Sequence, residues 1–311
     1  MKHSLKIILT LLFMFFITQL IGLFIINQYS PHIEQVIGSD GLLTNKTIYN
    51  LPYGVEPPED ATPASTLISI IIAIVIAVVF MLVLMRYKVV VFFRAWFFIV
   101  VTFALAVAIN AIIIKIPYSS VVALIVAIPL AAIKLFKRNI IVHNVTELFI
   151  YPGIAVLFVP LLNIWAVVLL LLLISVYDIY AVWHAGFMQK MAQYQIEQLR
   201  LFSGFFIPYM GKKERDMIKN AKAHAKLKPN SKEKKVKVNV AILGGGDVVF
   251  PLILAGVVFN TLGLIQALII AVGATIALAS LFAISKKGRF YPAMPFISAG
   301  CLIALGLAYL I

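Results

Sequence analysis

Three acidic side chains lie within long apolar stretches of the sequence, where a charged group is unfavourable. They are Glu147, Asp178 and Asp247, whereas the other acidic residues lie in polar segments. A carboxylate inside a membrane-spanning segment is costly enough to be a functional candidate by default. Asp178 lies near the end of one apolar stretch and Asp247 near the start of the next. Because two successive spans run in opposite directions, both aspartates lie toward the same side and can face each other.

Two facing carboxyl groups in a site of low dielectric constant cannot both ionise. One group keeps a proton, and the pair titrates as a unit. An aspartic protease uses this arrangement: one carboxylate activates water, and the protonated partner polarises the scissile carbonyl. Two alternatives stay open on the pair alone. Each aspartate could bind a separate polar partner, or the two could relay protons or cations in a transporter or channel.

The elements that must hold this pair are membrane helices. The 311 residues are 63% hydrophobic and 12% charged, with a mean hydropathy of +1.05, whereas soluble domains are about half apolar and a quarter charged. This composition excludes a cytosolic enzyme, a disordered regulator and a disulfide scaffold, since Cys301 is the single cysteine. Apolar runs of roughly 20 residues predict an all-α polytopic membrane protein with nine transmembrane helices. The predicted spans are 5–26, 65–85, 95–114, 119–135, 140–160, 163–184, 239–259, 263–285 and 290–311.

The distribution of lysine and arginine predicts the orientation of the chain. With the N-terminus in the cytoplasm, every basic residue except Lys46 and Lys115 falls on the inner side, so the C-terminus is extracellular. The basic residues form short runs between apolar stretches, which argues against nucleic-acid binding. The predicted organisation is a six-helix membrane part (1–184), a basic cytoplasmic loop (185–238) and a three-helix membrane part (239–311).

Three irregular features lie on the same side as the aspartate pair. Gly244-Gly245-Gly246 lets another backbone approach closely, although tight helix packing is an equally physical interpretation. Lys235 to Val240 alternates polar and apolar residues as a strand does, and could pair with an extended peptide. Pro292-Ala293-Met294-Pro295 opens the ninth span and leaves backbone groups without helical partners. Irregular backbone at membrane depth is tolerated only where it is buried or lines a water-filled cavity.

Two polar segments interrupt the membrane pattern, and the first contains no residues that look catalytic. Residues 27–64 are predicted to form an irregular external loop. Within the cytoplasmic loop, Met188 to Met210 mixes apolar and polar residues, which predicts a helix at the membrane interface. The lysine-rich remainder predicts attraction to anionic lipid.

The remaining charged residues near the membrane are interpreted as structural. His143 and Glu147 lie four residues apart and are interpreted as an interfacial pair near Lys137 and Arg138, because a metal site needs more ligands. Lys134 is expected to extend toward the interface. The sequence has no Cys/His cluster, P-loop or dinucleotide-binding unit, so neither a metal nor a cofactor is expected.

Three motifs in this order resemble the presenilin and signal peptide peptidase family of intramembrane aspartyl proteases. They are Tyr177-Asp178 in the sixth span, Gly244-Gly245-Gly246-Asp247 (Gly-x-Gly-Asp) in the seventh, and Pro292-Ala293-Met294 at the start of the ninth. The family usually has leucine where this chain has Met294, and methionine conserves volume and apolarity. The predicted orientation matches the presenilin branch, and the size of the chain resembles archaeal members.

The resemblance implies roles for these residues. Asp178 and Asp247 would form the catalytic dyad, with Tyr177 and the three glycines shaping the site. Pro292-Ala293-Met294 would bind substrate, and Lys237 and Val238 would contact the substrate strand.

The predicted function is an intramembrane aspartic endopeptidase of the cell membrane that cleaves transmembrane segments of other proteins. Its expected partners are transmembrane substrates and the lipid bilayer. Accessory subunits are not expected to be required, and the sequence does not predict the oligomeric state. The alternative is a proton- or cation-coupled transporter or channel that uses the same two carboxylates. An ion pathway would have no need of the strand pattern before Asp247.

Overall fold

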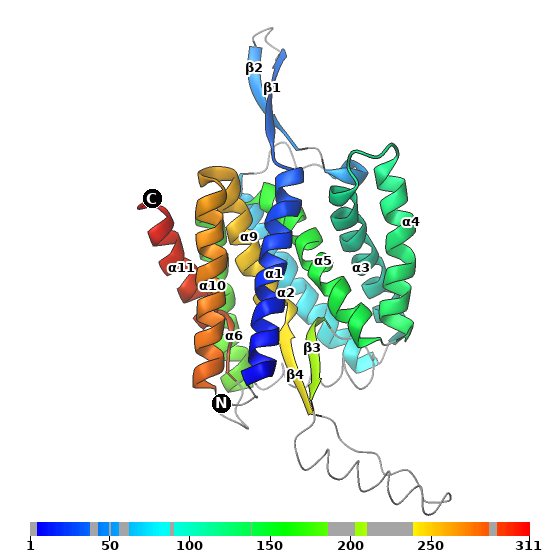
Figure 1. Cartoon of the computed structure of the whole chain (residues 1–311), viewed down its shortest axis with the longest axis vertical. Helices are drawn as coiled ribbons and strands as arrows, with labels where there is room; N and C mark the ends of the chain where they lie inside the picture. Colours follow the sequence, from blue (N-terminus) through cyan, green and yellow to red (C-terminus); the bar gives the residue numbers. More distant parts are fainter. Residues whose placement is uncertain are drawn as a thin grey trace, which may run out of the picture.

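The computed structural model describes residues 5–37, 43–49, 51–55, 62–87, 90–137, 139–185, 203–209, 239–285 and 291–311. Within these ranges it contains nine α-helices and two antiparallel hairpins (Figure 1). The helices are α1 (Leu5–Gln28), α2 (Pro63–Tyr87), α3 (Val90–Ile112), α4 (Ser119–Ala132), α5 (Ile140–Phe158), α6 (Ile164–Tyr180), α9 (Gly245–Leu262), α10 (Leu264–Ile284) and α11 (Met294–Ala308). The prediction of nine helical segments is therefore confirmed.

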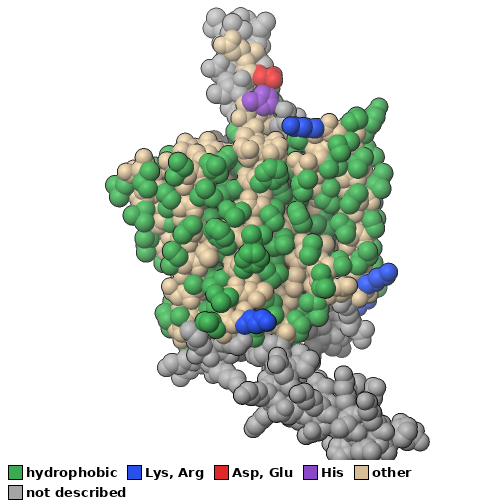
Figure 2. Space-filling model, in the orientation of Figure 1, with side chains coloured by type: hydrophobic (Ala, Val, Ile, Leu, Met, Phe, Trp, Pro, Cys, Tyr) green, Lys and Arg blue, Asp and Glu red, His purple; other side chains and the backbone are tan. Residues whose placement is uncertain are grey.

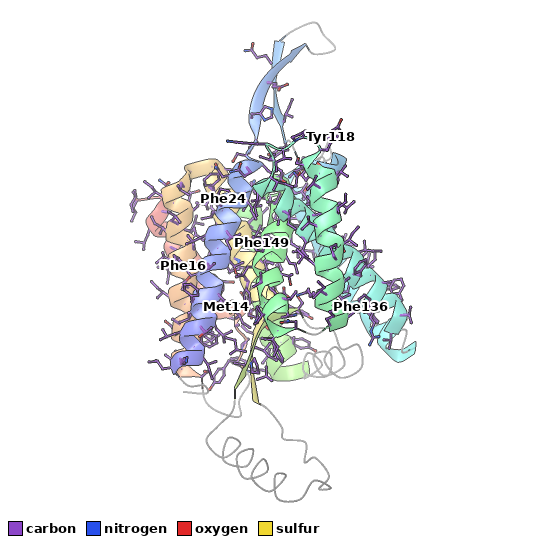
Figure 3. All side chains as sticks on the ribbon, turned by 45° about the vertical axis from the view of Figure 1, so that its right-hand side comes forward. Met14, Phe16, Phe24, Tyr118, Phe136 and Phe149 are labelled. Atoms are coloured by element: carbon purple, nitrogen blue, oxygen red, sulfur yellow. The ribbon has the colours of Figure 1, made fainter. Side chains whose placement is uncertain are left out.

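The helices are long and apolar, as a membrane requires. In the described part of the chain, seven helical segments are long and apolar enough to cross a bilayer, and α11 is apolar but shorter, with 15 residues. Side chains such as Phe24, Tyr118 and Phe136 are exposed and point outward from the bundle (Figure 3). On the face shown in Figure 2, apolar side chains cover the body of the molecule and basic side chains lie near its two ends. The protein is a multi-pass membrane protein.

Helix α9, which carries Asp247, lies at the centre of the bundle. It contacts α1, α5, α6, α10 and α11, and all its residues from Val248 to Val258 except Phe250 are buried. The pair α10 and α11 lies at one side of the bundle and the pair α3 and α4 at the other (Figure 1). The backbone that carries Asp247 is thus held by neighbours on several sides.

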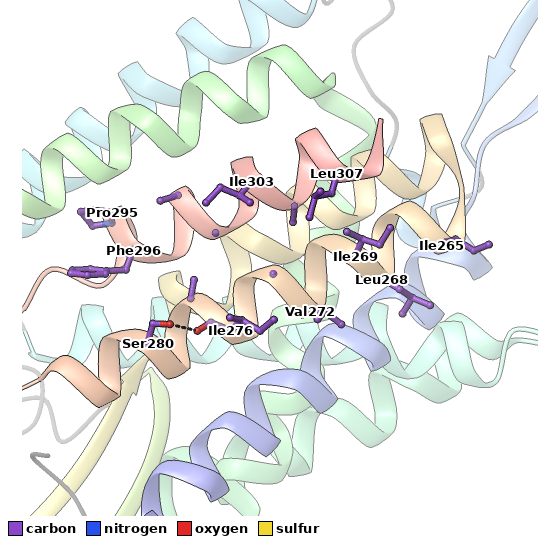
Figure 4. A pocket seen from close by; sticks show the side chains of 15 residues that line it. Ile265, Leu268, Ile269, Val272, Ile276, Ser280, Pro295, Phe296, Ile303 and Leu307 are labelled. Atoms are coloured by element: carbon purple, nitrogen blue, oxygen red, sulfur yellow. Dashed lines mark hydrogen bonds between the residues drawn. The ribbon is translucent and has the colours of Figure 1, made fainter. Parts of the chain in front are cut away.

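Small residues bring α10 and α11 close together. A Cβ on Gly300 would collide with Ala277 and with the backbone of Gly273, so only glycine permits this approach. Beside this contact the two helices form a groove of about 860 Å³, lined by apolar side chains such as Ile276 and Leu307 (Figure 4). Neither Asp178 nor Asp247 lines this groove.

The segment between α1 and α2 is more regular than the sequence predicted. Strands β1 (His32–Ile37) and β2 (Leu43–Ile48) pair as an antiparallel hairpin that projects from one end of the bundle (Figure 1). The prediction of an irregular loop over 27–64 is therefore wrong for these residues. Each strand is six residues long, too short for alternation to be distinguished from loop composition by sequence alone.

A second hairpin lies at the opposite end of the bundle and leads directly into α9 (Figure 1). It consists of β3 (Gly204–Tyr209) and β4 (Asn239–Gly244), which pair antiparallel with Gly204 opposite Gly244. Residues 204–209 therefore form a strand, which corrects the prediction of an interfacial helix through Met210; residues 188–202 lie outside the described ranges. In β4 the buried side chains alternate with the exposed Ile242, as a half-buried strand requires.

The start of the seventh helix is also corrected. The sequence predicted a strand from Lys235 to Val240 and a span beginning at 239, but the strand extends to Gly244 and the helix begins at Gly245. Residues 235–238 lie outside the described ranges. The periodicity of the apolar run after Asn239 does not distinguish a buried strand from a helix. The pairing of β4 with β3 therefore determines where the strand ends and the helix begins.

A polar cluster joins three helices at the end of the bundle that carries β1 and β2. Tyr29 donates to the backbone carbonyl of Val107 at 3.0 Å, and Asn110 donates to the Tyr29 hydroxyl at 2.8 Å. Ser120 at the start of α4 donates to the Asn110 side chain at 3.4 Å. These bonds fix α1, α3 and α4 far from the two aspartates.

Candidate active site

Asp178 lies in the last turn of α6 and is buried. Its Oδ2 accepts a hydrogen bond from the backbone N–H of Met294 at 3.1 Å, and the backbone N–H of Ala293 donates to the same carboxylate. These N–H groups belong to the first turn of α11, where a helix leaves its donors without internal partners. The carboxylate of one helix therefore caps the start of another, and the Pro292-Ala293-Met294 motif binds Asp178 through its backbone.

Asp247 lies in the first turn of α9, three residues after Gly244, the residue that precedes the helix. Its carboxylate accepts from the backbone N–H of Gly244, as acidic residues at this position of a helix often do. The start of a helix also favours negative charge through the alignment of its peptide dipoles. Asp247 is only partly buried, so a reacting group can reach it.

The two carboxyl groups meet where α6, α9 and α11 contact one another. Asp178 and Asp247 are close enough for their charges to interact. Ser175, one turn before Asp178, donates to Ser298 of α11 at 2.8 Å and holds α6 against α11. The two aspartates predicted to face each other are therefore brought together.

No positive charge neutralises this pair in the described part of the chain. The ion pairs there involve other side chains, and the aspartates are held by backbone N–H groups. Two carboxyl groups in such a site share a proton, because the repulsion of two charges is not compensated. The pair can therefore supply one acid and one base.

The three glycines before Asp247 have different surroundings. A Cβ on Gly245 would lie 2.8 Å from the ring of Tyr151 and 3.0 Å from the hydroxyl of Ser203. A Cβ on Gly244 would lie 3.1 Å from Oδ2 of Asp247, whereas one on Gly246 would make only ordinary contact with Phe250. Close packing therefore requires glycine at 245, whereas the exposed Gly246 would tolerate a Cβ.

The other predicted site residues are placed as follows. Tyr177 is 40% exposed and directs part of its ring outward, although its hydroxyl interacts electrostatically with Asp178. Pro292 and Met294 are buried and Ala293 is partly exposed. Lys237 and Val238 lie outside the described residues.

A buried ion pair near this site was missed by the sequence analysis. The ammonium of Lys134 lies 2.6 Å from Oε1 of Glu147, and both side chains are almost fully buried, at 2% and 1% exposed. Lys134 therefore does not extend toward the interface. His143 and Glu147 do face each other, with Nε2 of His143 3.5 Å from Oε1 of Glu147, but the Glu147 side chain is buried and not interfacial. The chain leaves α4 through a π-helical turn, Ile133–Lys137, which turns Lys134 inward to α5.

Side chains of α5 hold the outer edge of β3. The Asn144 amide donates to the carbonyl of Phe206 at 2.9 Å and accepts from its N–H at 3.0 Å. Nε2 of His143 lies 2.8 Å from the carbonyl of Gly204, and Oε1 of Glu147 accepts from the N–H of Gly204 at 3.3 Å. The only sequence signal for this contact was the four-residue spacing of His143 and Glu147.

Metal binding finds no support in the described residues. They contain no group of three or more histidine, cysteine or acidic side chains that could hold an ion. Two facing carboxyl groups inside a bundle of apolar helices are the arrangement that an intramembrane aspartic protease requires.

Comparisons with known proteins agree with this class. The family model for signal-peptide peptidase, presenilin aspartyl protease matches residues 41–311, so the chain belongs to this family. It is an intramembrane aspartyl protease. A comparison with curated proteins found no match.

Two solved structures share the fold. Both are described as a presenilin family intramembrane aspartate protease, one in space group C222 and one in P2, and both are 17% identical in sequence. The first covers 97% of this chain and 98% of its own with a TM-score of 0.56, and the second covers 97% of each with a TM-score of 0.58. At this identity the likeness concerns the fold alone.

Proposed function

We propose that Asp178 and Asp247 are the catalytic pair of this protease and hydrolyse peptide bonds within transmembrane segments of membrane proteins. The observation that carries the assignment is the junction of α6, α9 and α11. There the two carboxyl groups interact with each other, and backbone N–H groups of two helix starts hold them. The alternative, an ion pathway through the same carboxylates, has no such specific observation in its favour.

We propose a starting protonation state for the pair. Asp178 accepts from two backbone N–H groups and Asp247 from one, which supports a mechanism in which Asp178 begins as the carboxylate and Asp247 carries the shared proton. Asp178 takes a proton from water as the water oxygen bonds to the carbonyl carbon, and Asp247 protonates the carbonyl oxygen. Asp178 then protonates the amide nitrogen, Asp247 takes a hydroxyl proton, and the C–N bond breaks. An acid and an amine leave, and the pair again holds one proton.

The substrate must be extended to be cut, because an amide inside a helix is shielded from attack. Gly204 and Phe206 direct their backbone groups toward α5, away from β4. Their partners in the register are Gly244 and Ile242, so the backbone groups of Ile242 point to the opposite edge of β4. A substrate strand adds at this edge, directly before Asp247. Lys237 and Val238, which precede β4 in the sequence and lie outside the described residues, are proposed to contact the substrate.

The residues around the pair complete the proposed site. Gly246 is exposed and has no side chain, so a substrate backbone can approach the residue that precedes Asp247. Pro292-Ala293-Met294 orients Asp178 through its N–H groups and presents the partly exposed Ala293 to the substrate. Tyr177 lies at the outer side of α6, where a substrate helix would enter from lipid.

We further propose that the N-terminus is cytoplasmic, the C-terminus extracellular and the host membrane the cell membrane. The distribution of lysine and arginine supports this orientation, which puts β3, β4 and the aspartates toward the cytoplasm. The enzyme is proposed to act without accessory subunits.

The test uses the purified full chain in detergent and a fluorescent peptide containing one transmembrane segment. Wild type should release peptide products, and an aspartic-protease transition-state analogue should block their release. Asp178→Asn and Asp247→Asn should release none, because asparagine cannot exchange the proton. Normal cleavage by either variant would refute the assignment.

A matched control removes a carboxylate elsewhere. Glu34 on β1 is exposed and lies at the other end of the bundle, so Glu34→Gln should cleave as wild type does. Proton or cation flux in liposomes that persists in the absence of any peptide product would favour the transporter instead.

A further inference from the structure

The two edges of the β3–β4 hairpin are not equivalent. Asn144 forms hydrogen bonds with both the N–H and the carbonyl of Phe206. His143 binds the carbonyl of Gly204, and Glu147 binds its N–H. Side chains of α5 thus take the place of a neighbouring strand along the outer edge of β3. An unpaired strand edge is a template for another chain, and here one edge is already occupied.

The polar side chains on this edge hold one another in place. The carbonyl of Gly204 can only accept, so Nε2 of His143 is the donor. The Lys134 ammonium can only donate, and it lies 3.3 Å from Nδ1 of His143 and 2.6 Å from Glu147. One tautomer of His143, protonated at Nε2, satisfies both neighbours. Each side chain therefore has a single arrangement in which all these bonds form.

An apolar contact connects the same face of α5 to the start of α9. The ring of Tyr151 packs edge-on against the ring of Phe205 in β3, with centroids 5.7 Å apart. The same ring leaves no space for a side chain at Gly245, two residues before Asp247. Helix α5 thus contacts both the hairpin and the start of the helix that carries Asp247.

We propose that Asn144, His143 and Glu147, supported by Lys134, are positioning residues for proteolysis. They occupy the free edge of β3, so that a substrate strand adds only to β4. They also fix the position of β4 relative to Asp247. The inference rests on the proposed function, because it takes Asp247 as catalytic and β4 as the substrate's partner. Loosening this contact lets the substrate shift along the strand, so that neighbouring peptide bonds reach the aspartates.

The test compares two asparagine-to-alanine variants. Asn144→Ala removes two hydrogen bonds to Phe206, and Asn110→Ala removes two hydrogen bonds of the polar cluster at the far end of the bundle. Melting temperature, kcat, KM and the masses of the products are measured for both in detergent. Asn144→Ala should lower kcat about tenfold or more, because a small misplacement of the reacting groups slows the reaction. It should also add products that are cut at neighbouring peptide bonds. Asn110→Ala should cut at the wild-type bonds whatever its melting temperature.

A second pair of variants covers the case in which Asn144→Ala does not fold. His143→Gln keeps an N–H donor that can reach Gly204, whereas His143→Leu does not. The glutamine variant should keep the wild-type product masses, and the leucine variant should spread them. Wild-type masses and kcat for both Asn144→Ala and His143→Leu would overturn the inference.

Asp247→Asn in the same assay separates this inference from the proposed function. Cleavage by Asp247→Asn would refute the catalytic assignment itself. Loss of cleavage in Asp247→Asn, together with unchanged products in the α5 variants, would refute only the positioning role.

Discussion

Glu147 and the pair Asp178 and Asp247 lie toward the same end of the bundle, but only Glu147 has a cation beside it. Glu147 is neutralised by Lys134 at 2.6 Å and also binds the backbone of β3. Within the described residues, Asp178 and Asp247 have no ion-pair partner and are held by the N–H groups of two helix starts. The charge of Glu147 is neutralised by Lys134, whereas the aspartate pair can gain or lose a proton.

The difference shows how a membrane protein separates structural from chemical carboxylates. A buried ion pair costs desolvation but is stable against the loss of a proton, because each charge needs the other. Helix starts supply only partial positive charge, so they orient a carboxylate without fixing its protonation state. The pair that lacks a cation is therefore the one suited to acid–base chemistry.

The largest effect is expected where the pair loses an ionisable group. Asp178→Asn and Asp247→Asn should lower kcat/KM by at least about 10⁴-fold, while the melting temperature changes little because no charge is left unpaired. Peptide cleavage and thermal unfolding in detergent measure the two effects on one sample. A large loss of stability without loss of activity would place these aspartates in the same class as Glu147.

Lys134→Met should show the reverse pattern. It leaves the Glu147 carboxylate buried without a cation and should lower the free energy of unfolding by about 3–5 kcal/mol. The double variant Lys134→Met/Glu147→Leu removes both charges and should recover much of that loss. Thermal unfolding of the single and double variants tests this, and equal instability of the two would show that the charge is not the cause.

A smaller effect is expected at the glycines before Asp247. Gly245→Ala forces a methyl group against Tyr151 and Ser203 and should destabilise the fold by about 1–3 kcal/mol. Gly246→Ala makes only ordinary contact with Phe250 and should change stability by no more than about 0.5 kcal/mol. Melting temperatures of the two variants compare them directly. A greater loss of stability for Gly246→Ala would contradict the difference between the two positions.

The smallest effect is expected at the hydroxyl contact between α6 and α11. Ser298→Ala removes one hydrogen bond with Ser175 and should cost about 0.6 kcal/mol, a typical value for such bonds in membranes. Asp178 remains held by Met294, so cleavage should persist. Complete loss of cleavage at unchanged melting temperature would mean that the serines take part in the chemistry.

The residues themselves predicted much of this protein. Long apolar runs mark the helices, and Asp178, Asp247 and the Pro292-Ala293-Met294 segment stand out because charges and prolines are rare at such positions. These signals are local or periodic, so they survive without knowledge of the fold. The number of the helices and their approximate positions in the sequence follow from these signals.

Only the tertiary structure decided how the site is supported. Glu147 and Gly204 lie 57 positions apart, and His143 and Gly204 lie 61 apart, so no local pattern connects them. The inward turn of Lys134 depends on the π-helical turn that follows α4, and the extent of β4 depends on its pairing with β3. A short apolar run is compatible with a strand or a helix. The hydrogen-bond partner of a buried polar group depends on which segments pack beside it. Those choices are made by contacts between distant segments, and a sequence alone does not contain the distances.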